Sequence, residues 1–251
     1  MFENRNTSIS QYCPCKCFEL AGKSFTILTS SFGIFQIHFI DENQVEVSLR
    51  QTAETCDYYC TKAGDTMYFI HIELPKTDHR EGLSIAADAG NGDWTFILAK
   101  QGHKTDNFRQ VEHQIFCGVT LSADSHAYSS DLDLAPKPLF SEALVGRQIE
   151  YTYSEGFSVQ HHYINTHKFE WTITREQFFP ENIGISHQEY CDVVLLHDNY
   201  LLFSWLEAES GTQGCFILNT ISMRTAGAFF GVGPNGLPES YPMGAFARVI
   251  I

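Results

Sequence analysis

Short stretches in which apolar and polar residues alternate recur along this chain, and they constrain its fold more than any other feature of the sequence. Alternation with a period of two places every second side chain on the same face of a β-strand. Turn-forming residues separate the stretches, among them Gly90-Asn-Gly-Asp93, whose Asn-Gly pair suits a tight hairpin. In the first half, the alternation predicts strands over 24–27, 35–40, 45–49, 67–74, 94–99 and 111–121.

The pattern then restarts in the second half of the chain. At an offset of 124 residues (144 − 20), Leu20-Ala-Gly-Lys23 aligns with Leu144-Val-Gly-Arg147. After an insertion of ten residues the offset becomes 134 (207 − 73), and Phe69-Ile-His-Ile-Glu73 aligns with Phe203-Ser-Trp-Leu-Glu207. Matches that occur in the same order in both halves indicate a duplicated domain.

Each repeat has room for about eight strands of the usual length. Eight antiparallel strands that close on themselves leave no exposed sheet edge and enclose a space for one small ligand. We therefore expect an all-β protein with two tandem lipocalin-like antiparallel β-barrels, and a β-sandwich is the alternative. The expected segments are an amino-terminal arm (1–19), a first barrel (20–123), a linker (124–143) and a second barrel (144–251).

The charge of the chain narrows its range of partners. Thirty acidic and 16 basic side chains give a formal net charge of −14. This charge repels phosphate backbones and anionic membrane surfaces, so we expect neither a nucleic-acid nor a membrane partner. No apolar run reaches the length of about 20 residues that spans a bilayer, and the first residues show no export signal. The sequence predicts a soluble, cytoplasmic protein, with a homodimer left open.

Eight cysteines in a reducing compartment are expected to be mostly free thiols. A soft metal ion could be coordinated by Cys13, Cys15 and Cys17, but their spacing lacks the paired C-x-x-C units of a zinc site. The histidines of the second half lack the H-x-H and i, i+4 spacings that bring two imidazoles together. We therefore expect no metal ion and no cofactor.

Three residues of the second half are the strongest candidates for chemistry. Tyr151 and Tyr153 lie two positions apart, so both phenol rings project from one face of a strand. Glu207 shares a face with Phe203 and Trp205, so a carboxyl group accompanies two apolar rings. Burial would raise the pKa of Glu207 and suit it to acid–base chemistry near neutral pH. The alternative is a carboxylate at a strand end that points into water.

Two further residues are candidates for the same site. His161 and His162 are adjacent on a strand, so only one of them faces inward, where a histidine can relay protons. Arg224 precedes an aromatic and glycine-rich run. An inward guanidinium there would bind an acidic ligand, whereas a surface arginine is the alternative. The G-x-G-x-x-G pattern at 231–236 ends on a loop, so it is no phosphate-binding motif.

Several short motifs of the second half occur together in one known protein family. They are Leu144-Val-Gly-Arg147, Tyr151-Thr-Tyr153, His161-His-Tyr-Ile-Asn165, Trp171, Tyr200-Leu-Leu-Phe-Ser-Trp205 with Glu207, Met223-Arg-Thr-Ala-Gly227, Phe230-Gly231 and Pro242-Met-Gly-Ala245. Through them the second half resembles the carboxyl-terminal domain of the molybdenum cofactor biosynthesis protein F (MoaF) family, and the first half would be its more divergent amino-terminal domain. The resemblance implies a tandem calycin-like fold.

Part of this set is also similar to the phenolic acid decarboxylases, which are small lipocalin-like enzymes. The similarity rests on Val145-Gly-Arg147, Tyr151-Thr-Tyr153 and Ser204-Trp-x-Glu207. It implies that the tyrosines hold a substrate carboxylate while Glu207 handles the proton of a para-hydroxyl group. The arginine that this family places between the motifs is missing, and Gly184-Ile-Ser-His-Gln-Glu189 stands there instead. In the first half, Ile27 and Thr29 replace the tyrosines.

Together these observations predict that the second barrel binds a small acidic or aromatic metabolite. It would act on this metabolite by cofactor-free acid–base chemistry, as a lyase or isomerase. Glu207 would be the acid or base, Tyr151, Tyr153 and Arg224 would orient the ligand, and Phe203, Trp205, Trp171 and His161 would line the pocket. The alternatives are a non-catalytic carrier or sensor, an accessory protein in molybdenum cofactor biosynthesis, and a module that assembles a dimer or partner complex.

Overall fold

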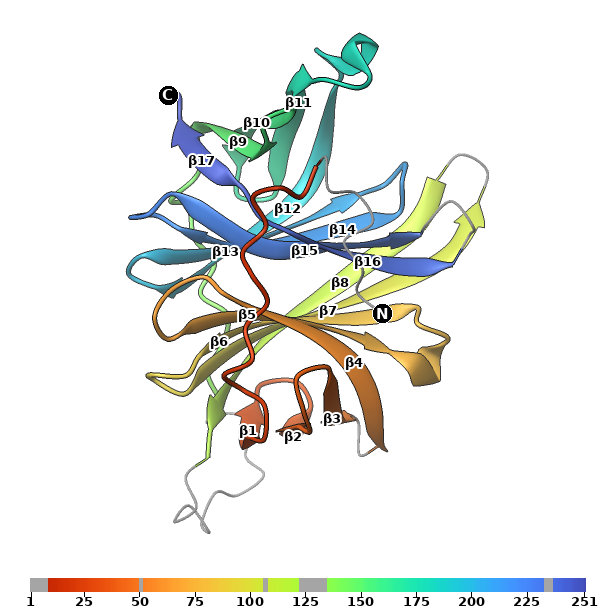
Figure 1. Cartoon of the computed structure of the whole chain (residues 1–251), viewed down its shortest axis with the longest axis vertical. Coiled ribbons are helices and arrows are strands. Elements are labelled where there is room, and N and C mark those ends of the chain that lie inside the picture. Colours follow the sequence, from red (N-terminus) through yellow and green to blue (C-terminus); the bar gives the residue numbers. More distant parts are fainter. Residues whose placement is uncertain (1–8, 50–51, 106–107, 122–134, 233–236) are drawn as a thin grey trace. The chain divides into compact units, whose positions relative to one another are not determined.

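The computed structural model describes residues 9–49, 52–105, 108–121, 135–232 and 237–251 (Figure 1). The chain divides into two compact units. The first contains Cys15–Lys100 and His113–Pro138, and the second contains Phe2–Pro14, Gln101–Glu112 and Leu139–Ile251. Of the expected linker, residues 124–134 lie outside the described part of the chain.

Most of the first unit is a closed antiparallel barrel in which each strand pairs with the next and β8 pairs back onto β1, and residues 101–105 of β7 and 108–112 of β8 are assigned to the second unit. Its strands are β1 (Ser24–Thr29), β2 (Gly33–Phe39), β3 (Gln44–Leu49), β4 (Thr52–Lys62), β5 (Met67–Leu74), β6 (Glu81–Asp88), β7 (Asp93–Thr105) and β8 (Phe108–Thr120), with the short 3₁₀ helix η1 (Pro75–Thr77). Aromatic and aliphatic side chains fill its interior, and the rings of Phe96 and Phe116 stack there 4.8 Å apart. The alternation in β2 buries Phe35, Ile37 and Phe39 in this core.

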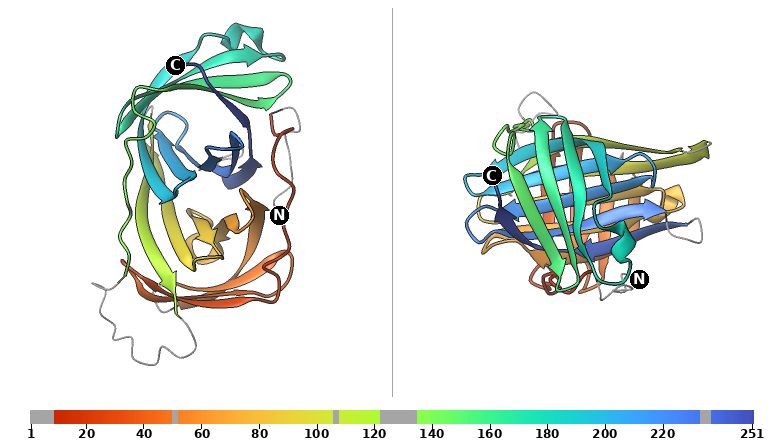
Figure 2. Two further views of the ribbon diagram at one scale, coloured as in Figure 1. Left: turned by 90° about the vertical axis from the view of Figure 1, so that its left-hand side faces the viewer. Right: turned by 90° about the horizontal axis from the view of Figure 1, so that it is seen from above.

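The second unit is a barrel of the same design (Figure 2). Its strands are β9 (Gln148–Ser154), β10 (Phe157–Asn165), β11 (Lys168–Glu176), β12 (Ser186–His197), β13 (Tyr200–Glu207), β14 (Thr212–Asn219), β15 (Arg224–Val232), β16 (Pro238–Met243) and β17 (Phe246–Val249), with the 3₁₀ helix η3 (Pro180–Asn182). The ring runs from β9 through β14 to β15 and closes through β17, which pairs with both β15 and β9. Strand β16 pairs with β15.

The strand positions repeat with the offsets found in the sequence. Strand β1 begins at Ser24 and β9 at Gln148, an offset of 124 residues (148 − 24). Strand β4 begins at Thr52 and β12 at Ser186, an offset of 134 (186 − 52). The ten-residue insertion therefore lies between β11 and β12, where η3 is found. The prediction of two tandem antiparallel barrels is confirmed, and the β-sandwich alternative is wrong.

Alternation in the sequence does not reveal β4 and β6. All the side chains of β6 are buried, so its sequence lacks the alternation that marks a strand with one wet face. In β4, the run from Tyr58 to Thr61 is buried without interruption, which hides the period of two in the same way.

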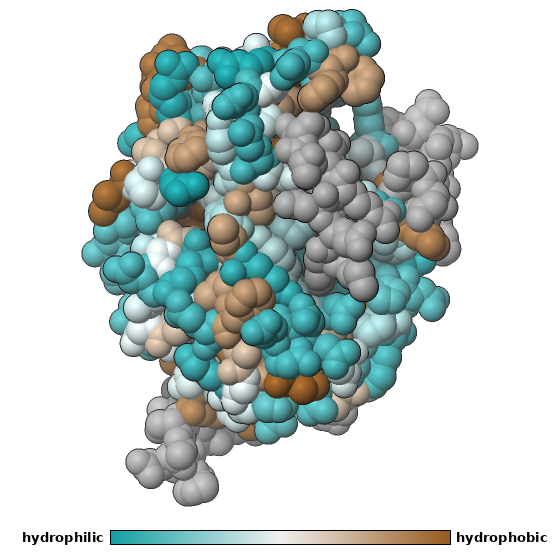
Figure 3. Space-filling model, in the orientation of Figure 1, coloured by the Kyte–Doolittle hydropathy of each residue, from teal (hydrophilic) through white to brown (hydrophobic). Residues whose placement is uncertain are grey.

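Among the described residues, no helix has the length and apolar character needed to cross a bilayer. On the face shown in Figure 3, hydrophobic residues form several separate groups among hydrophilic ones.

Candidate active site in the second barrel

A pocket of about 230 Å³ lies within the second barrel. Its buried inner part is formed by Tyr153, Val159, His161, Trp205 and Met243, and its half-buried outer part by Ile9, Phe157, Trp171, Ile173, Glu207 and Phe229. The period of two explains most of the set, because β10, β11 and β13 each contribute residues two positions apart. The volume exceeds the roughly 150 Å³ of a protein cavity that holds benzene. The pocket is large enough for a ligand of one or two rings.

Glu207 is the acidic residue of this pocket, at the end of β13. One carboxylate oxygen, Oε1, accepts a hydrogen bond from Trp205 Nε1 at 3.0 Å, and Oε2 accepts one from Ser210 Oγ at 3.0 Å. Burial raises the pKa of Glu207 above its usual value, although both hydrogen bonds and nearby His187 oppose this effect. The carboxyl group is thus fixed in orientation and shifted towards the protonated form, which is what a general acid or base near neutral pH requires.

A second carboxyl group lies near Glu207. Burial raises the pKa of Glu189 on β12, and the negative charge of Glu207 adds to this effect. His187, on the same strand, stacks on Trp171 with 5.1 Å between the ring centroids and lies 3.9 Å from the carboxylate of Glu209. This end of the barrel therefore combines several titratable groups around an apolar pocket, an arrangement typical of functional sites.

Replacing Glu207 by glutamine is expected to change stability in a pH-dependent way. Because the folded-state pKa of Glu207 is raised, its ionisation opposes folding once the pH exceeds the unfolded-state value of about 4.3. The free energy of unfolding of Glu207→Gln, relative to that of wild type, should rise as the pH increases from about 4 to about 8. Urea denaturation at each pH measures this difference. Glu209→Gln, at a side chain that is 68% exposed, is the control, and an equal pH trend in both variants would contradict the prediction.

Tyr151 and Tyr153 both face the barrel interior, but their surroundings differ. The Tyr153 hydroxyl has no hydrogen-bond partner among the described residues, and Tyr153 lines the pocket. The Tyr151 hydroxyl bonds that of Tyr163 at 2.8 Å, and the Tyr163 hydroxyl lies 3.4 Å from Nδ1 of His161. Burial raises the pKa of all three phenols. Tyr153 thus offers a free polar group to a ligand, whereas Tyr151 belongs to an internal hydrogen-bonded chain.

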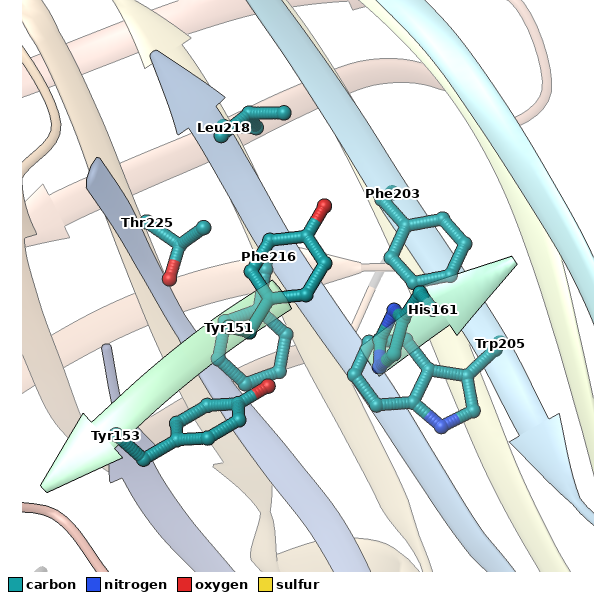
Figure 4. A pocket seen from close by; sticks show the side chains of 8 residues that line it. All are labelled: Tyr151, Tyr153, His161, Phe203, Trp205, Phe216, Leu218 and Thr225. Carbon is teal, nitrogen blue, oxygen red and sulfur yellow. The ribbon is translucent and has the colours of Figure 1, made fainter. Parts of the chain in front are cut away.

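His161 faces inward and is 4% exposed, while His162 is on the other side of β10. Burial lowers the pKa of His161 to about 3, so its imidazole is neutral at physiological pH. Its ring lies 5.7 Å from that of Trp205, and Figure 4 shows the two side chains against each other. A neutral, enclosed histidine does not suit the proton relay expected from the sequence, and it acts as part of the pocket wall.

The structure separates the expected ligand-binding residues into two groups. Trp171, Trp205 and His161 line the large pocket with Glu207 and Tyr153. Phe203 and Tyr151 border only a void of about 10 Å³, which is too small for a ligand and which Tyr153, His161 and Trp205 also border (Figure 4). Phe203 therefore packs the core.

The expectation that Arg224 faces the ligand is corrected by the structure. Arg224 is exposed at the start of β15, and its guanidinium lies 4.5 Å from the ring centroid of Phe246. It shares its side of the strand with Ala226 and Ala228, while Thr225 and Phe229 line the interior pockets. Arg224 cannot neutralise an acidic ligand in this pocket.

Several pocket residues were not identified from the sequence. Ser210 follows β13 in a turn and holds one carboxylate oxygen of Glu207. Ile9 belongs to the amino-terminal arm, and no sequence signal connects it with a barrel that begins about 140 residues later in the chain. Phe157, Val159 and Ile173 were detectable in principle, because they continue the inward alternation of β10 and β11.

Other sequence features carry less information about function. All eight cysteines are free thiols. Among the described residues, no three His, Cys, Asp or Glu side chains come together to hold a metal ion. Four of the six residues in the G-x-G-x-x-G pattern, 233–236, lie outside the described part of the chain.

Part of the chain is similar in sequence to known proteins. A protein called MoaF from Klebsiella aerogenes is 29% identical over 123 residues, which are 47% of this chain and 45% of that protein. The match thus covers less than half the length of the relative. A crystal structure from Burkholderia vietnamiensis, provisionally named a beta-lactamase, aligns with 43% of this chain and 96% of its own at 12% identity and a TM-score of 0.35.

The family described as the MoaF C-terminal domain matches residues 138–251, which include every strand of the second barrel. The motifs around Tyr151, His161 and Glu207 lie within this match. The second barrel is therefore similar to the MoaF C-terminal domain along all of its strands.

Proposed function

We propose that the second barrel binds a small, neutral, largely aromatic molecule and exchanges a proton with it through Glu207. The observation that carries this proposal is the position of Glu207, a carboxyl group of raised pKa in the wall of an apolar pocket of about 230 Å³. A buried carboxyl group opposes folding unless something compensates for it, and functional sites are where such groups are retained.

The charges around the pocket favour a neutral ligand over an acidic one. The described lining residues include no lysine or arginine, and the charged group among them is the carboxyl of Glu207. An anionic ligand would therefore be desolvated beside a second negative group without a cation to pair with. The walls of Phe157, Trp171, Trp205 and Phe229 suit the face and edge contacts of an aromatic ring.

Tyr153 and Glu207 divide the proposed chemistry between them. The free hydroxyl of Tyr153 would donate a hydrogen bond to an acceptor on the ligand, such as a carbonyl oxygen, and so polarise it. Glu207 would then remove or return a proton at a neighbouring carbon. Lyase or isomerase reactions that need only proton transfer fit this pair. Carriage of the same ligand without reaction is the second candidate function, because the pocket alone is sufficient for it.

A two-ring neutral ketone, 2-acetylnaphthalene, tests binding and proton transfer in one experiment. Binding is followed by quenching of tryptophan fluorescence, and proton transfer by deuterium exchange of the methyl protons next to the carbonyl. Wild type should bind the ketone and accelerate the exchange. Glu207→Gln should keep the affinity within about threefold and lose about 100-fold in the exchange rate, because general acid–base catalysis contributes about 10² to 10⁴.

The outcomes separate the two functions. Binding without any accelerated exchange in wild type supports the carrier. Equal exchange rates in wild type and Glu207→Gln contradict the acid–base role. Glu209→Gln, which changes an exposed carboxylate near the same end of the barrel, should behave as wild type.

A further inference from the structure

The amino-terminal arm lies against the second barrel beside the pocket. Residues 9–14 belong to this unit, and in Figure 1 they are the beginning of the red segment, near β17. The backbone N–H of Tyr12 donates to the carbonyl oxygen of Tyr153 at 3.0 Å, and the backbone N–H of Glu155 donates to Oε1 of Gln11 at 2.9 Å. The Tyr12 ring meets the edge of the Phe246 ring with 4.9 Å between centroids. The arm is therefore specifically docked along the end of β9.

The arm covers the part of the β9 edge that does not pair with β17. The pairing of β17 with β9 ends at Phe246 and Thr152, and β9 continues to Ser154. The Tyr12 hydrogen bond to Tyr153 takes up the next position on that edge. On the other side, a β-carbon built on Gly244 would lie 2.4 Å from Cδ of Pro14 and 3.1 Å from the carbonyl oxygen of Tyr12. The chain thus needs a glycine where the arm crosses the turn between β16 and β17.

The arm also contributes to the pocket itself. Ile9 is one of the lining residues, and it is half-buried like the other members of the outer part, Phe157, Trp171, Ile173 and Phe229. The inner part is formed by residues of the strands. A segment that is not a strand of the barrel therefore supplies part of the pocket mouth.

We propose that residues 9–14 form a strap that gates this pocket, so that release of the strap from β9 admits and discharges the ligand. The inference rests on the proposed function, because it assigns regulation of access to the same site. The strap suits this task because it is not a strand of the barrel and meets the edge of β9 at Tyr153, whereas β10 pairs with β9 at six positions. Segments outside the strand ladders can open locally while the rest of the fold stays intact.

The test uses the full-length chain with three substitutions at one position. Tyr12→Pro removes the N–H that bonds Tyr153, and Tyr12→Ala removes the ring that contacts Phe246. Tyr12→Phe keeps both contacts and is the matched control. One readout is the rate of association and dissociation of 2-acetylnaphthalene, measured by stopped-flow fluorescence. The other is quenching of tryptophan fluorescence by acrylamide, which reports access to Trp171 and Trp205 without any ligand. Trp94 belongs to the first barrel, so its contribution to the fluorescence should be the same in all variants.

Loosening of the strap should raise both rate constants in Tyr12→Pro and Tyr12→Ala by about fivefold, as expected for the loss of one hydrogen bond or ring contact, while Kd changes less than about threefold. The acrylamide quenching constant should rise in the same two variants, with unchanged circular dichroism. Tyr12→Phe should match wild type in every measurement.

Three results would overturn the gate. One is unchanged acrylamide access in both strap variants. Another is unchanged ketone kinetics together with increased access. The third is loss of ketone binding in both variants, which would make the arm a fixed part of the wall. Failure of wild type to bind the ketone contradicts the proposed function instead, and the acrylamide measurement still decides whether the strap controls access.

Discussion

Gly214→Ala is expected to destabilise the second barrel by about 3 kcal/mol, the upper range for an overpacked core. Gly214 on β14 is the register partner of Trp205 on β13, and the indole lies over it. A β-carbon at this position would be 2.3 Å from Cζ2 and 2.5 Å from Cε2 and Cη2 of the indole. The indole lines the pocket, so its displacement would change the pocket wall, and the variant should also lose affinity for 2-acetylnaphthalene. Urea denaturation and ketone titration measure the two effects.

A double variant tests whether the indole contact causes the loss of stability. Trp205→Phe replaces the indole with a smaller ring, so the double variant Gly214→Ala, Trp205→Phe should lose less stability than the two single variants added together. Gly156→Ala is the matched control, because its β-carbon would lie 2.7 Å from Oε1 at the flexible end of Gln177, which can rotate away, and 3.1 Å from Cβ of the same residue, a milder contact than that with the indole. A loss in Gly156→Ala equal to that in Gly214→Ala would show that the indole contact is not the cause.

Phe203→Ala is expected to lower the free energy of unfolding by about 3 to 5 kcal/mol, as for other buried aromatic residues. Phe203 is 4% exposed, and its ring lies 4.9 Å from that of Trp205 and 5.1 Å from those of Tyr163 and Phe169. Because it borders the small void and not the pocket, the folded fraction of the variant should still bind 2-acetylnaphthalene. Denaturation and titration of the same preparation provide both values.

The control for Phe203 is Phe178→Ala, between β11 and β12, where the side chain is 60% exposed. Its effect on stability should stay within about 0.5 kcal/mol. The opposite pattern for Phe203→Ala, with nearly full stability and no ketone binding, would return Phe203 to the ligand-binding role that the sequence suggested.

Alternation and repetition were enough to predict the architecture. The stretch 67–74 is the full length of β5, and the two offsets place the insertion between β11 and β12. Phase within a strand also placed Glu207 on the same face as Phe203 and Trp205, which all contribute to the interior pockets. The strands, the position of the insertion and the inward face of β13 all follow from local periodicity, which can be detected in a single sequence.

The details of the site depend on tertiary structure, which the periodicity of the sequence does not reveal. In β15, the run from Thr225 to Phe230 is small or apolar at nearly every position, so the sequence does not reveal that Arg224 is in phase with the outer face. Tyr151 and Tyr153 have the same phase, and only the position of Tyr163 on β10 decides which hydroxyl is paired. Ile9 reaches the pocket through the path of the arm, which is a matter of tertiary structure.

The hollow in the second barrel has a thermodynamic consequence for the protein without ligand. Apolar side chains that face this hollow lack the packing partners that they would have in a filled core, so the ligand-free native state does without part of its packing energy. An occupant that fills the hollow would restore part of it, so the cellular lifetime of the protein would follow the supply of its ligand.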